Sequence, residues 1–407
     1  MQFKHLLLLG AFSMPQLLFA QWSRLTTGTT KDLKTIHFLN NDLGFAAGKD
    51  GVLIKTSNGG SNWTTITTAT TKEIKSMYFV DANTGWLVGK DGLIKKTSDG
   101  GSTWSTQVST INEDFNDVHF INAAQGVIVG EKGSVLVTSN GGSTWTNKSV
   151  TTGNGNGSDD EGADIYKVQM LSGSKVYAAG KDAFFAVSNN GGSTWTAQSC
   201  GTSSDLEGMY FTSESNGYVC YKAGGVRKTN GNGTFTPVTA ATSKDLSSLF
   251  FISDSKGWTV GEEGRIQYTE NSGSTWSAQN LSSVTADLND VYFPSEDKGY
   301  IAAEDGIILK YIKGTGNPTS INTSALLSGV RLYPNPVASM LHIEIAEIPA
   351  NQKVSIVAHD ISGKVVATHT FQGGTTFEIP CTSWSNGLYS IHISVSEKVA
   401  IQKVIKQ

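Results

Sequence analysis

Carboxylates recur along this chain at one fixed place in a repeating pattern. A single acidic residue stands immediately before each of seven similar apolar segments: Asp32, Glu73, Asp114, Asp164, Asp205, Asp245 and Asp287. Arranged around a common axis, these groups would form a ring that could hold a cation or a polar ligand. They could also supply the paired carboxylates that glycosidases use. The same side chains could instead cap turns or accept hydrogen bonds from backbone amides of a neighbouring repeat, and the pattern leaves all these roles open.

Few other residues offer chemistry. His37 and His119 occupy equivalent positions in two of the apolar segments, where tyrosine or phenylalanine stands in most of the others. We therefore predict that both histidines are core aromatic residues and not ligands. The chain has no Cys/His metal spacing, no glycine-rich phosphate loop opening a helix and no nucleophile elbow.

One insertion interrupts the repeat. Trp145 and Trp195 lie 50 residues apart, and the extra residues fall within Thr151–Gly162. Loops on rigid scaffolds often carry function, and carboxylates can ligate Ca²⁺. The acidic residues here are Asp159, Asp160 and Glu161, whose spacing fits no known calcium loop. We expect no cofactor; a calcium site and a plain surface insertion are the two interpretations of this loop.

Composition is that of a folded, exported protein. Charged residues make up 16% of the 407 residues and the net charge is −4, without the basic clusters that nucleic-acid binding requires. Residues 1–20 predict a signal peptide, with Gln21 as the mature start; an uncleaved anchor is the alternative. No later segment has 18 consecutive apolar residues, so no transmembrane segment is expected after cleavage.

Three cysteines are too few for a disulfide framework. They are Cys200, Cys220 and Cys381. Cys200 and Cys220 could pair in an oxidising compartment, or both could be buried apolar thiols.

A glycine-rich phrase, in most copies ending in tryptophan, recurs six times near a 41-residue spacing. Clear copies read T-S-N-G-G-S-N-W at Thr56–Trp63 and T-S-D-G-G-S-T-W at Thr97–Trp104. A fixed period of this size indicates a repeat architecture. Each repeat predicts four short strands, the first being apolar on both faces, as in Leu33–Phe38. The second strand, such as Gly44–Gly48, and the third, such as Val52–Thr56, are joined by an Asp-Gly hairpin turn.

Four antiparallel strands per repeat describe a propeller blade, and seven first strands predict seven blades. The seventh repeat stops near Tyr311 without its fourth strand. The residues that begin at Gln21 match those after each glycine-rich phrase, and Trp22 lies 41 residues before Trp63. We therefore predict that this N-terminal strand pairs with the last three strands and closes the ring, which removes a free sheet edge.

The phrase resembles the Asp-box, also called the bacterial neuraminidase repeat, through the pattern S/T-x-D/N-x-G-x-S/T-W. Its Asx side chains bond their own downstream amides, and its tryptophan buries a large ring against the neighbouring sheet. Both are expected to be structural. The turn residues are Asn58, Asp99, Asn140, Asn190 and Asn271, and the anchors are Trp63, Trp104, Trp145, Trp195 and Trp276.

Asp-box propellers include sialidases, a family that binds the substrate carboxylate with an arginine triad. The predicted propeller contains only Arg24, Arg227 and Arg265, and none lies in the family's R-I-P context. Lysine substitutes poorly for the guanidinium fork, so sialidase activity is not expected. The two-propeller xyloglucanases also carry Asp-boxes, but this chain predicts one propeller.

The whole repeat is similar to the propeller family of photosystem II assembly and stability factors. Gly85–Trp104 closely follows the family's string G-W-x-x-G-x-x-G-x-I-x-x-T-x-D-G-G-x-T-W. The resemblance spans about residues 21–312 and implies the propeller fold. The photosystem role is not carried over, because secreted members in non-photosynthetic settings share the fold without that partner.

A second module at residues 329–407 follows a predicted linker at 313–328. Its alternating strands predict a small Ig-like β-sandwich. Three segments resemble the type A sorting domain of the type IX secretion system: L-Y-P-N-P at Leu332–Pro336, D-I-S-G-K at Asp360–Lys364 and G-L-Y-S-I at Gly387–Ile391. The resemblance implies export by the type IX machinery, cleavage in the linker by a sortase-like peptidase, and release or attachment to lipopolysaccharide at the cell surface.

These expectations combine into an all-β protein, secreted or on the outer-membrane surface, with a seven-bladed propeller at residues 21–312. We expect a non-catalytic binding or scaffold module that recognises glycan or protein through its turn-rich face. A carbohydrate-active hydrolase using carboxylates at the channel mouth is the alternative.

Overall fold

The computed structural model describes residues 21–150, 162–231, 233–238, 242–313, 329–346, 352–360, 365–395 and 398–407. The predicted signal peptide, most of the Thr151–Gly162 insertion with its three acidic residues, and the predicted linker after Lys313 lie outside these ranges. The chain divides after Lys313 into two compact units, which are described separately.

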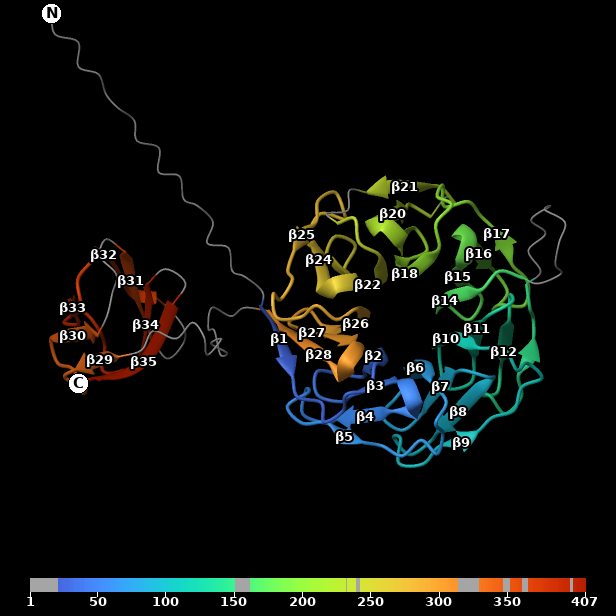
Figure 1. Ribbon diagram of the computed structural model, residues 1–407, viewed down its shortest axis with the longest axis horizontal. Helices are drawn as coiled ribbons and strands as arrows, with labels where there is room; N and C mark the ends of the chain where they lie inside the picture. Colours follow the sequence, from blue (N-terminus) through green and yellow to red (C-terminus); the bar gives the residue numbers. More distant parts are fainter. Residues whose placement is uncertain are drawn as a thin grey trace, which may run out of the picture. The chain divides into compact units, whose positions relative to one another are not determined.

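Seven four-stranded antiparallel sheets surround a central channel in the first unit (Figure 1). Blade 1 consists of β2 (Leu33–Phe38), β3 (Gly44–Gly48), β4 (Leu53–Thr56) and β5 (Thr64–Thr65). Blade 2 consists of β6 (Ile74–Phe79), β7 (Gly85–Gly89), β8 (Leu93–Thr97) and β9 (Ser105–Thr106). Blade 3 consists of β10 (Phe115–Phe120), β11 (Gly126–Gly130), β12 (Val135–Thr138) and β13 (Thr146–Asn147). Blade 4 consists of β14 (Ile165–Met170), β15 (Val176–Gly180), β16 (Phe185–Ser188) and β17 (Thr196–Ala197). Blade 5 consists of β18 (Leu206–Ser213), β19 (Asn216–Tyr221), β20 (Gly225–Thr229) and β21 (Phe235–Val238). Blade 6 consists of β22 (Leu246–Phe251), β23 (Gly257–Gly261), β24 (Arg265–Thr269) and β25 (Ser277–Ala278). Blade 7 consists of β26 (Leu288–Ser295), β27 (Lys298–Ala303), β28 (Ile308–Ile312) and β1 (Gln21–Leu25). The predicted seven-bladed propeller is confirmed.

Strand β1 closes the ring, as the sequence predicts. It pairs antiparallel with β28, and Trp22 lies opposite Tyr311. Trp22 is only 3% exposed, and its ring centroid lies 6.0 Å from that of Phe293 and 5.4 Å from that of Tyr311. Its Nε1 donates a hydrogen bond to Gln279 Oε1 of blade 6 at 3.2 Å. The start of the propeller is therefore held by both of the last two blades.

The innermost strands carry the core on one side and the channel wall on the other. In β6, Ile74, Met77 and Phe79 are buried, whereas Lys75 and Tyr78 are half-buried and line a cavity in the channel. A β-bulge at the start of β6 shifts the register between Ile74 and Ser76, and such bulges re-aim side chains. The prediction of burial on both faces needs one correction: the channel side borders a cavity and not a second packed core.

The turns between second and third strands account for two features that recur in the repeats of this chain. Asp50 and Gly51 have φ values of 55° and 69°, and Asp-Gly adopts this left-handed conformation at low cost. Gly48, just before the turn, has no room for a side chain, because an added Cβ would lie 1.9 Å from Asp32 O. This contact draws the turn close to the start of the innermost strand.

The Asp-box turns are closed by their own side chains. In blade 2, Thr97 Oγ1 donates to Asp99 Oδ1 at 2.8 Å and accepts from Gly101 N at 2.9 Å. Asp99 Oδ1 also accepts from Thr103 N at 2.8 Å. Asn58, Asn140, Asn190 and Asn271 accept the equivalent amide hydrogen bond in their own turns. Trp104 is half-buried and stands edge-on to Phe79 at 6.0 Å.

Asp-box carbonyls also join neighbouring blades, which the sequence pattern alone did not indicate. Lys55 donates from Nζ to Gly100 O at 2.8 Å, and Lys96 to Gly141 O at 2.9 Å. Each lysine comes from the third strand of the preceding blade and lies over an aromatic ring of its own blade. The glycine-rich turn is thus both a hairpin and a joint between blades.

The second unit is a two-sheet β-sandwich, as predicted. One sheet contains β29 (Val330–Tyr333), β30 (Met340–Ile345) and β33 (Thr376–Pro380). The other contains β32 (Val365–Gln372), β31 (Lys353–His359), β34 (Gly387–Val395) and β35 (Lys398–Lys406). Alternate residues such as Ile343, Ile356 and Ile391 are at most 2% exposed and share one hydrophobic core.

The three cysteines are all buried and free, so Cys200 and Cys220 are not paired. Within the ranges given above, no helix has both the length and the apolar character that a membrane crossing requires.

Candidate functional site

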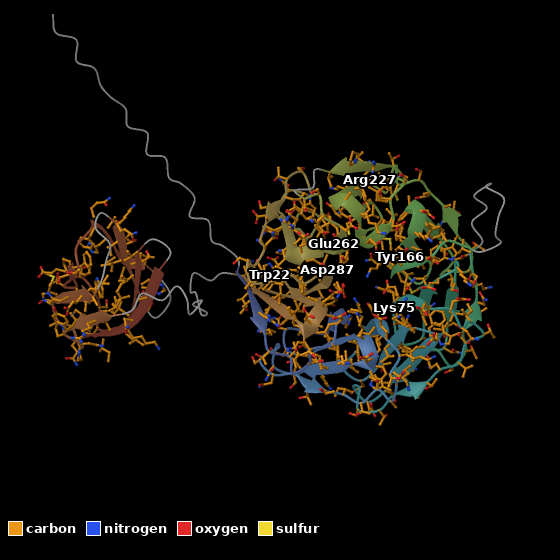
Figure 2. The ribbon with its side chains drawn as sticks, viewed as in Figure 1. Trp22, Lys75, Tyr166, Arg227, Glu262 and Asp287 are labelled. Carbon is orange, nitrogen blue, oxygen red and sulfur yellow. The ribbon has the colours of Figure 1, made fainter. Side chains whose placement is uncertain are left out.

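The seven predicted acids circle one end of the channel, since each stands at the start of an innermost strand (Figure 2 labels Asp287). Six of them accept a hydrogen bond from a backbone N–H of the preceding blade, at 2.7–3.1 Å. The donor in each case is the left-handed residue of the turn after the second strand. The donor–acceptor pairs are Asp305–Asp32, Asp91–Asp114, Lys132–Asp164, Asp182–Asp205, Ala223–Asp245 and Glu263–Asp287.

Lysines neutralise several of these acids. Glu73, the member without such an amide donor among the described contacts, forms an ion pair with Lys90 at 3.1 Å. Lys49 pairs with Asp32 and holds the pKa of that carboxyl below its ordinary value. Lys222 lies 2.7 Å from Asp205 and lowers its pKa in the same way. The acids therefore connect blades to one another; ligand binding by this ring remains a prediction.

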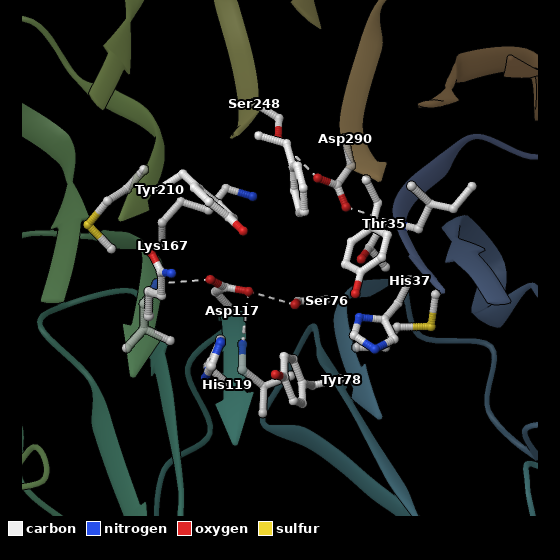
Figure 3. A pocket seen from close by; sticks show the side chains of 18 of the residues that line it. Thr35, His37, Ser76, Tyr78, Asp117, His119, Lys167, Tyr210, Ser248 and Asp290 are labelled. Carbon is white, nitrogen blue, oxygen red and sulfur yellow. Dashed lines mark hydrogen bonds between the residues drawn. The ribbon is translucent and has the colours of Figure 1, made fainter. Parts of the chain in front are cut away.

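A cavity of about 240 Å³ occupies the channel (Figure 3). Its walls come from the innermost strands of all seven blades. A first ring in these walls consists of six polar residues at equivalent strand positions: Thr35, Ser76, Asp117, Lys167, Ser248 and Asp290. Gly208 holds the seventh equivalent position and does not line the cavity.

Two carboxylates of this polar ring connect three blades each. Asp117 Oδ1 accepts from Ser76 Oγ at 2.6 Å and from Val118 N at 3.0 Å, and its Oδ2 accepts from Val168 N at 2.8 Å. Burial nevertheless raises the pKa of Asp117, outweighing these hydrogen bonds and the charge of Lys167. Asp290 repeats the arrangement with Ser248 Oγ, Val291 N and Ile36 N at 3.0, 3.0 and 3.1 Å.

Lys167 carries the one ammonium group of the polar ring. Its side chain points into the cavity (Figure 3), and no hydrogen-bond or ion-pair partner for it is found among the described residues. Burial opposes its charge, but the surrounding groups, Asp117 and Asp290 first among them, together offset this effect, so the pKa of Lys167 is raised. The group therefore stays protonated and keeps its hydrogen-bond donors directed at the cavity.

Aromatic rings form a belt at the next level of the channel. Neighbouring ring centroids lie 4.4–5.1 Å apart. Gln169 interrupts the belt, and its amide is engaged with Phe211 N at 2.7 Å and Phe211 O at 3.0 Å. The aromatic members are His37, Tyr78, His119, Tyr210, Phe250 and Tyr292.

Three tyrosine hydroxyls of the belt have no hydrogen-bond partner among the described residues: those of Tyr78, Tyr210 and Tyr292. Burial raises the pKa of Tyr210 to about 12, with a contribution from Tyr78 on the opposite wall. Burial and both other tyrosines raise the pKa of Tyr292 as well. Burial raises the pKa of Tyr78 too, so all three hydroxyls remain protonated near pH 7.

The two histidines serve as wall residues and hold fixed tautomers. His37 Nε2 donates to Phe79 O at 3.2 Å, and His119 Nδ1 accepts from Met170 N at 3.4 Å. Burial lowers the pKa of His37 to about 4. Burial, with a further contribution from His37, lowers that of His119 to about 3. Both are neutral near pH 7, in keeping with the predicted role as aromatic residues.

Other candidate groups lie away from the cavity or are inert. Arg24, Arg227 and Arg265 lie on three different blades, and none lines the cavity. Burial raises the pKa of Cys200 and of Cys220 to about 12, so neither is a reactive thiol. Among the described residues, no group of three or more His, Cys, Asp or Glu side chains could hold a metal ion.

Sequence reasoning missed the polar ring, although a signal for it exists. The third residue of each aligned innermost strand is Thr, Ser, Asp, Lys or Gly within otherwise apolar segments. Polar residues that recur at one position of otherwise apolar strands indicate a strand face that does not pack against the hydrophobic core. The acids at the strand starts are easier to see because all seven share one charge.

Comparison with known families and structures supports the same architecture. A family model described as "Photosynthesis system II assembly factor YCF48" matches residues 14–312, and one described as "Secretion system C-terminal sorting domain" matches residues 331–407. Curated proteins gave no match.

Several solved propellers have the same fold. A structure described as "YCF48 bound to D1 peptide" is 19% identical, with a TM-score of 0.62 over 74% of this chain and 100% of that one. YCF48 from Cyanidioschyzon merolae is 21% identical, with a TM-score of 0.61 over 72% and 99%. The WD40 propeller domain of Doa1 is 11% identical, with a TM-score of 0.62 over 74% and 100%.

The C-terminal sorting domain implies handling by the type IX secretion system and indicates a secreted or cell-surface protein. At such low identities the solved structures show the fold alone. The first family model, however, covers well over half of the residues, and this chain therefore belongs to the YCF48 family of photosystem II assembly-factor propellers.

Proposed function

We propose that this exported propeller is a non-catalytic binding or scaffold module that recognises a glycan or a protein. The cavity of the channel carries the proposal. The ammonium of Lys167 and the hydroxyls of the three lining tyrosines have no hydrogen-bond partners among the described residues, whereas Asp117 and Asp290 are both engaged between blades. A concave site with a few unpaired polar groups on aromatic walls is typical of ligand recognition.

The binding face is the one that carries the seven acids and the turns after the second strands. Lys75, which lies toward the centre of the ring in Figure 2, lines the cavity and pairs with Asp114 of the acidic ring at 2.9 Å. A ligand in the cavity would therefore pass the acidic ring, and these carboxylates would contact its outer part. The solved relative bound to D1 peptide supports a protein segment as one ligand class for such propellers. Its photosystem partner is not proposed for this chain.

A glycosidase is the second candidate, because burial raises the pKa of Asp117 and of Glu207, a property of general acids. Both oxygens of Asp117 already accept hydrogen bonds from Ser76 and backbone amides. Protonating it to serve as an acid would break contacts between blades 2, 3 and 4. Glu207 lies 3.7 Å from the ammonium of Lys222, a contact that protonation would also weaken. These costs favour binding over hydrolysis.

A glycan array and a capture experiment with surface proteins test the proposal directly. The full chain is applied to both, and every hit is then incubated with the protein and analysed for products by mass spectrometry. We expect at least one bound glycan or protein that is recovered intact. Cleavage of a bound glycan would establish the hydrolase instead, and the absence of any hit would count against a binding module.

A further inference from the structure

We propose that the central cavity binds one neutral sugar residue end-on, with Lys167 donating to its oxygens and the aromatic belt receiving its apolar face. This inference rests on the proposed binding function and specifies both the ligand class and the residues that hold it. The terminal residue of a glycan and a free monosaccharide present the same chemistry to such a pocket.

The shape of the cavity favours a single terminal unit. Lining residues run from Lys75 at the mouth to the aromatic belt, and none lies beyond the belt in any innermost strand. The lining therefore ends at the belt, and the cavity of about 240 Å³ is walled by seven strands. An extended chain lying across the propeller could insert only its end into such a pocket.

The unpaired polar groups favour a ligand rich in hydroxyls. Lys167 offers up to three N–H donors, and the hydroxyls of Tyr78, Tyr210 and Tyr292 can each donate and accept. None of the four has a hydrogen-bond partner among the residues that the structure describes. Lys167 is half-buried, and an ammonium withdrawn from bulk water without acceptors is costly, so the pocket needs oxygen atoms from water or a ligand. A sugar supplies several such atoms within a compact ring.

The charges of the polar ring favour a neutral ligand over an anion. Asp117 and Asp290 face the ammonium of Lys167. Lys75, the other lysine of the lining, is already paired with Asp114 at 2.9 Å and Glu131 at 3.7 Å, so carboxylates outnumber cations around the cavity. A ligand carboxylate would add a further negative charge in a space poorly screened by water. A hydroxyl group instead accepts from Lys167 and can donate to the remaining lone pairs of an aspartate.

The belt supplies the apolar contact that a sugar ring also requires. The ring centroids of Tyr78 and His119 lie 4.4 Å apart and those of Tyr210 and Phe250 lie 4.6 Å apart, which gives nearly continuous aromatic surface around the inner end of the cavity. Binding pockets typically combine such surface with a few placed polar groups. The C–H face of a sugar would lie on the belt while its hydroxyls face the polar ring.

Titration with small molecules tests the pocket. Neutral monosaccharides, their disaccharides, and acetate and succinate are screened against the full chain by saturation-transfer NMR, and dissociation constants are measured by calorimetry. We expect a neutral monosaccharide to bind, and Lys167→Met to weaken it about tenfold or more, as for loss of a charged hydrogen-bond donor. Tyr210→Phe, which removes one hydroxyl, should also weaken binding of this monosaccharide. A disaccharide that binds as well as its terminal sugar identifies a glycan end; one that fails to bind identifies the free sugar.

Lys175→Met is the matched control, because Lys175 contacts Asn189 at 2.9 Å and lies outside the pocket. It should leave the dissociation constant unchanged, and circular dichroism of each variant verifies folding. Binding of carboxylates alone, no binding of any neutral sugar, or binding unaffected in both Lys167→Met and Tyr210→Phe would each overturn the proposal. Hits on the glycan array that persist in Lys167→Met would leave the binding function standing and remove only this pocket.

Discussion

Asp99 is the single carboxylate among five Asp-box positions that otherwise hold asparagine. Thr103, through its hydroxyl and its amide, lowers the pKa of Asp99 from 3.8 to about 2. A depressed carboxylate pKa stabilises the fold above the unfolded value, and this contribution is lost as the pH falls through the folded value. Wild type should therefore lose stability relative to Asp99→Asn as the pH falls from 5 towards 2 (the range set by these pKa values). Melting temperatures across that range check it, and a constant difference between the two proteins would contradict it.

His37 and His119 also make the stability of the fold depend on pH, because both are buried as neutral bases. Both are neutral in the fold, with pKa values of about 4 and about 3, while the unfolded chain binds protons below about 6.5. Stability should fall as the pH drops from about 6.5 towards 4, by about 3 kcal/mol per histidine at the lower end of that range. Replacing both by phenylalanine, which Phe250 shows is accepted in the belt, should remove most of this loss. Urea unfolding at pH 7 and pH 4.5 measures it; an unchanged pH dependence would exclude the histidines as its source.

Single-residue roles were predictable where the residue acts within its own turn. The Asx positions and tryptophans of the Asp-box follow from a local pattern, and their hydrogen bonds stay within five residues. Lys167 could not be assigned in the same way. The groups that act on it come from blades 3, 5 and 7, which only the closed ring brings together, and its own neighbours in the chain are ordinary strand residues.

At the scale of elements, one large buried side chain anchors β1 in the propeller. Trp22 is 3% exposed and contacts blades 6 and 7. Trp22→Ala should reduce the free energy of unfolding by about 3–5 kcal/mol, as for other large buried side chains. Arg24→Ala, on the same strand but exposed, should change it by no more than about 0.5 kcal/mol. Denaturant unfolding of the two variants compares them, and equal effects would show that Trp22 does not anchor the strand.

Strand positions were predictable from the repeat to within a residue or two, because seven copies report on one element. The first strand of blade 1, for example, spans Leu33–Phe38 as expected. Blade 5 is the exception: its outer strand β21 has four residues, against two in β5 and β9. Its Asp-box is degenerate and ends in Phe235, so the local turn that shortens the other outer strands is missing.

For the whole molecule, the sorting domain predicts where the protein goes. Removing residues 329–407 should leave the propeller in the periplasm, whereas the full chain should reach the cell surface or the medium. Fractionation with immunodetection in the native host distinguishes the two. We further propose cleavage between residues 313 and 328 by a sortase-like peptidase, which mass spectrometry of the exported product would locate. Export of the shortened chain would show that the tail is not the sorting signal.

The pairing of β1 with β28 has a consequence for the order of the chain. Gln21 lies opposite Ile312, so the two ends of the propeller are neighbours in one sheet. A short peptide could join them, and new ends could be opened at an exposed loop between two other blades, where such changes are best tolerated. The rearranged chain would contain the same blades in the same circle and the same central pocket. The fold of the ring does not require the chain to start at β1, and the chain could equally start between two other blades.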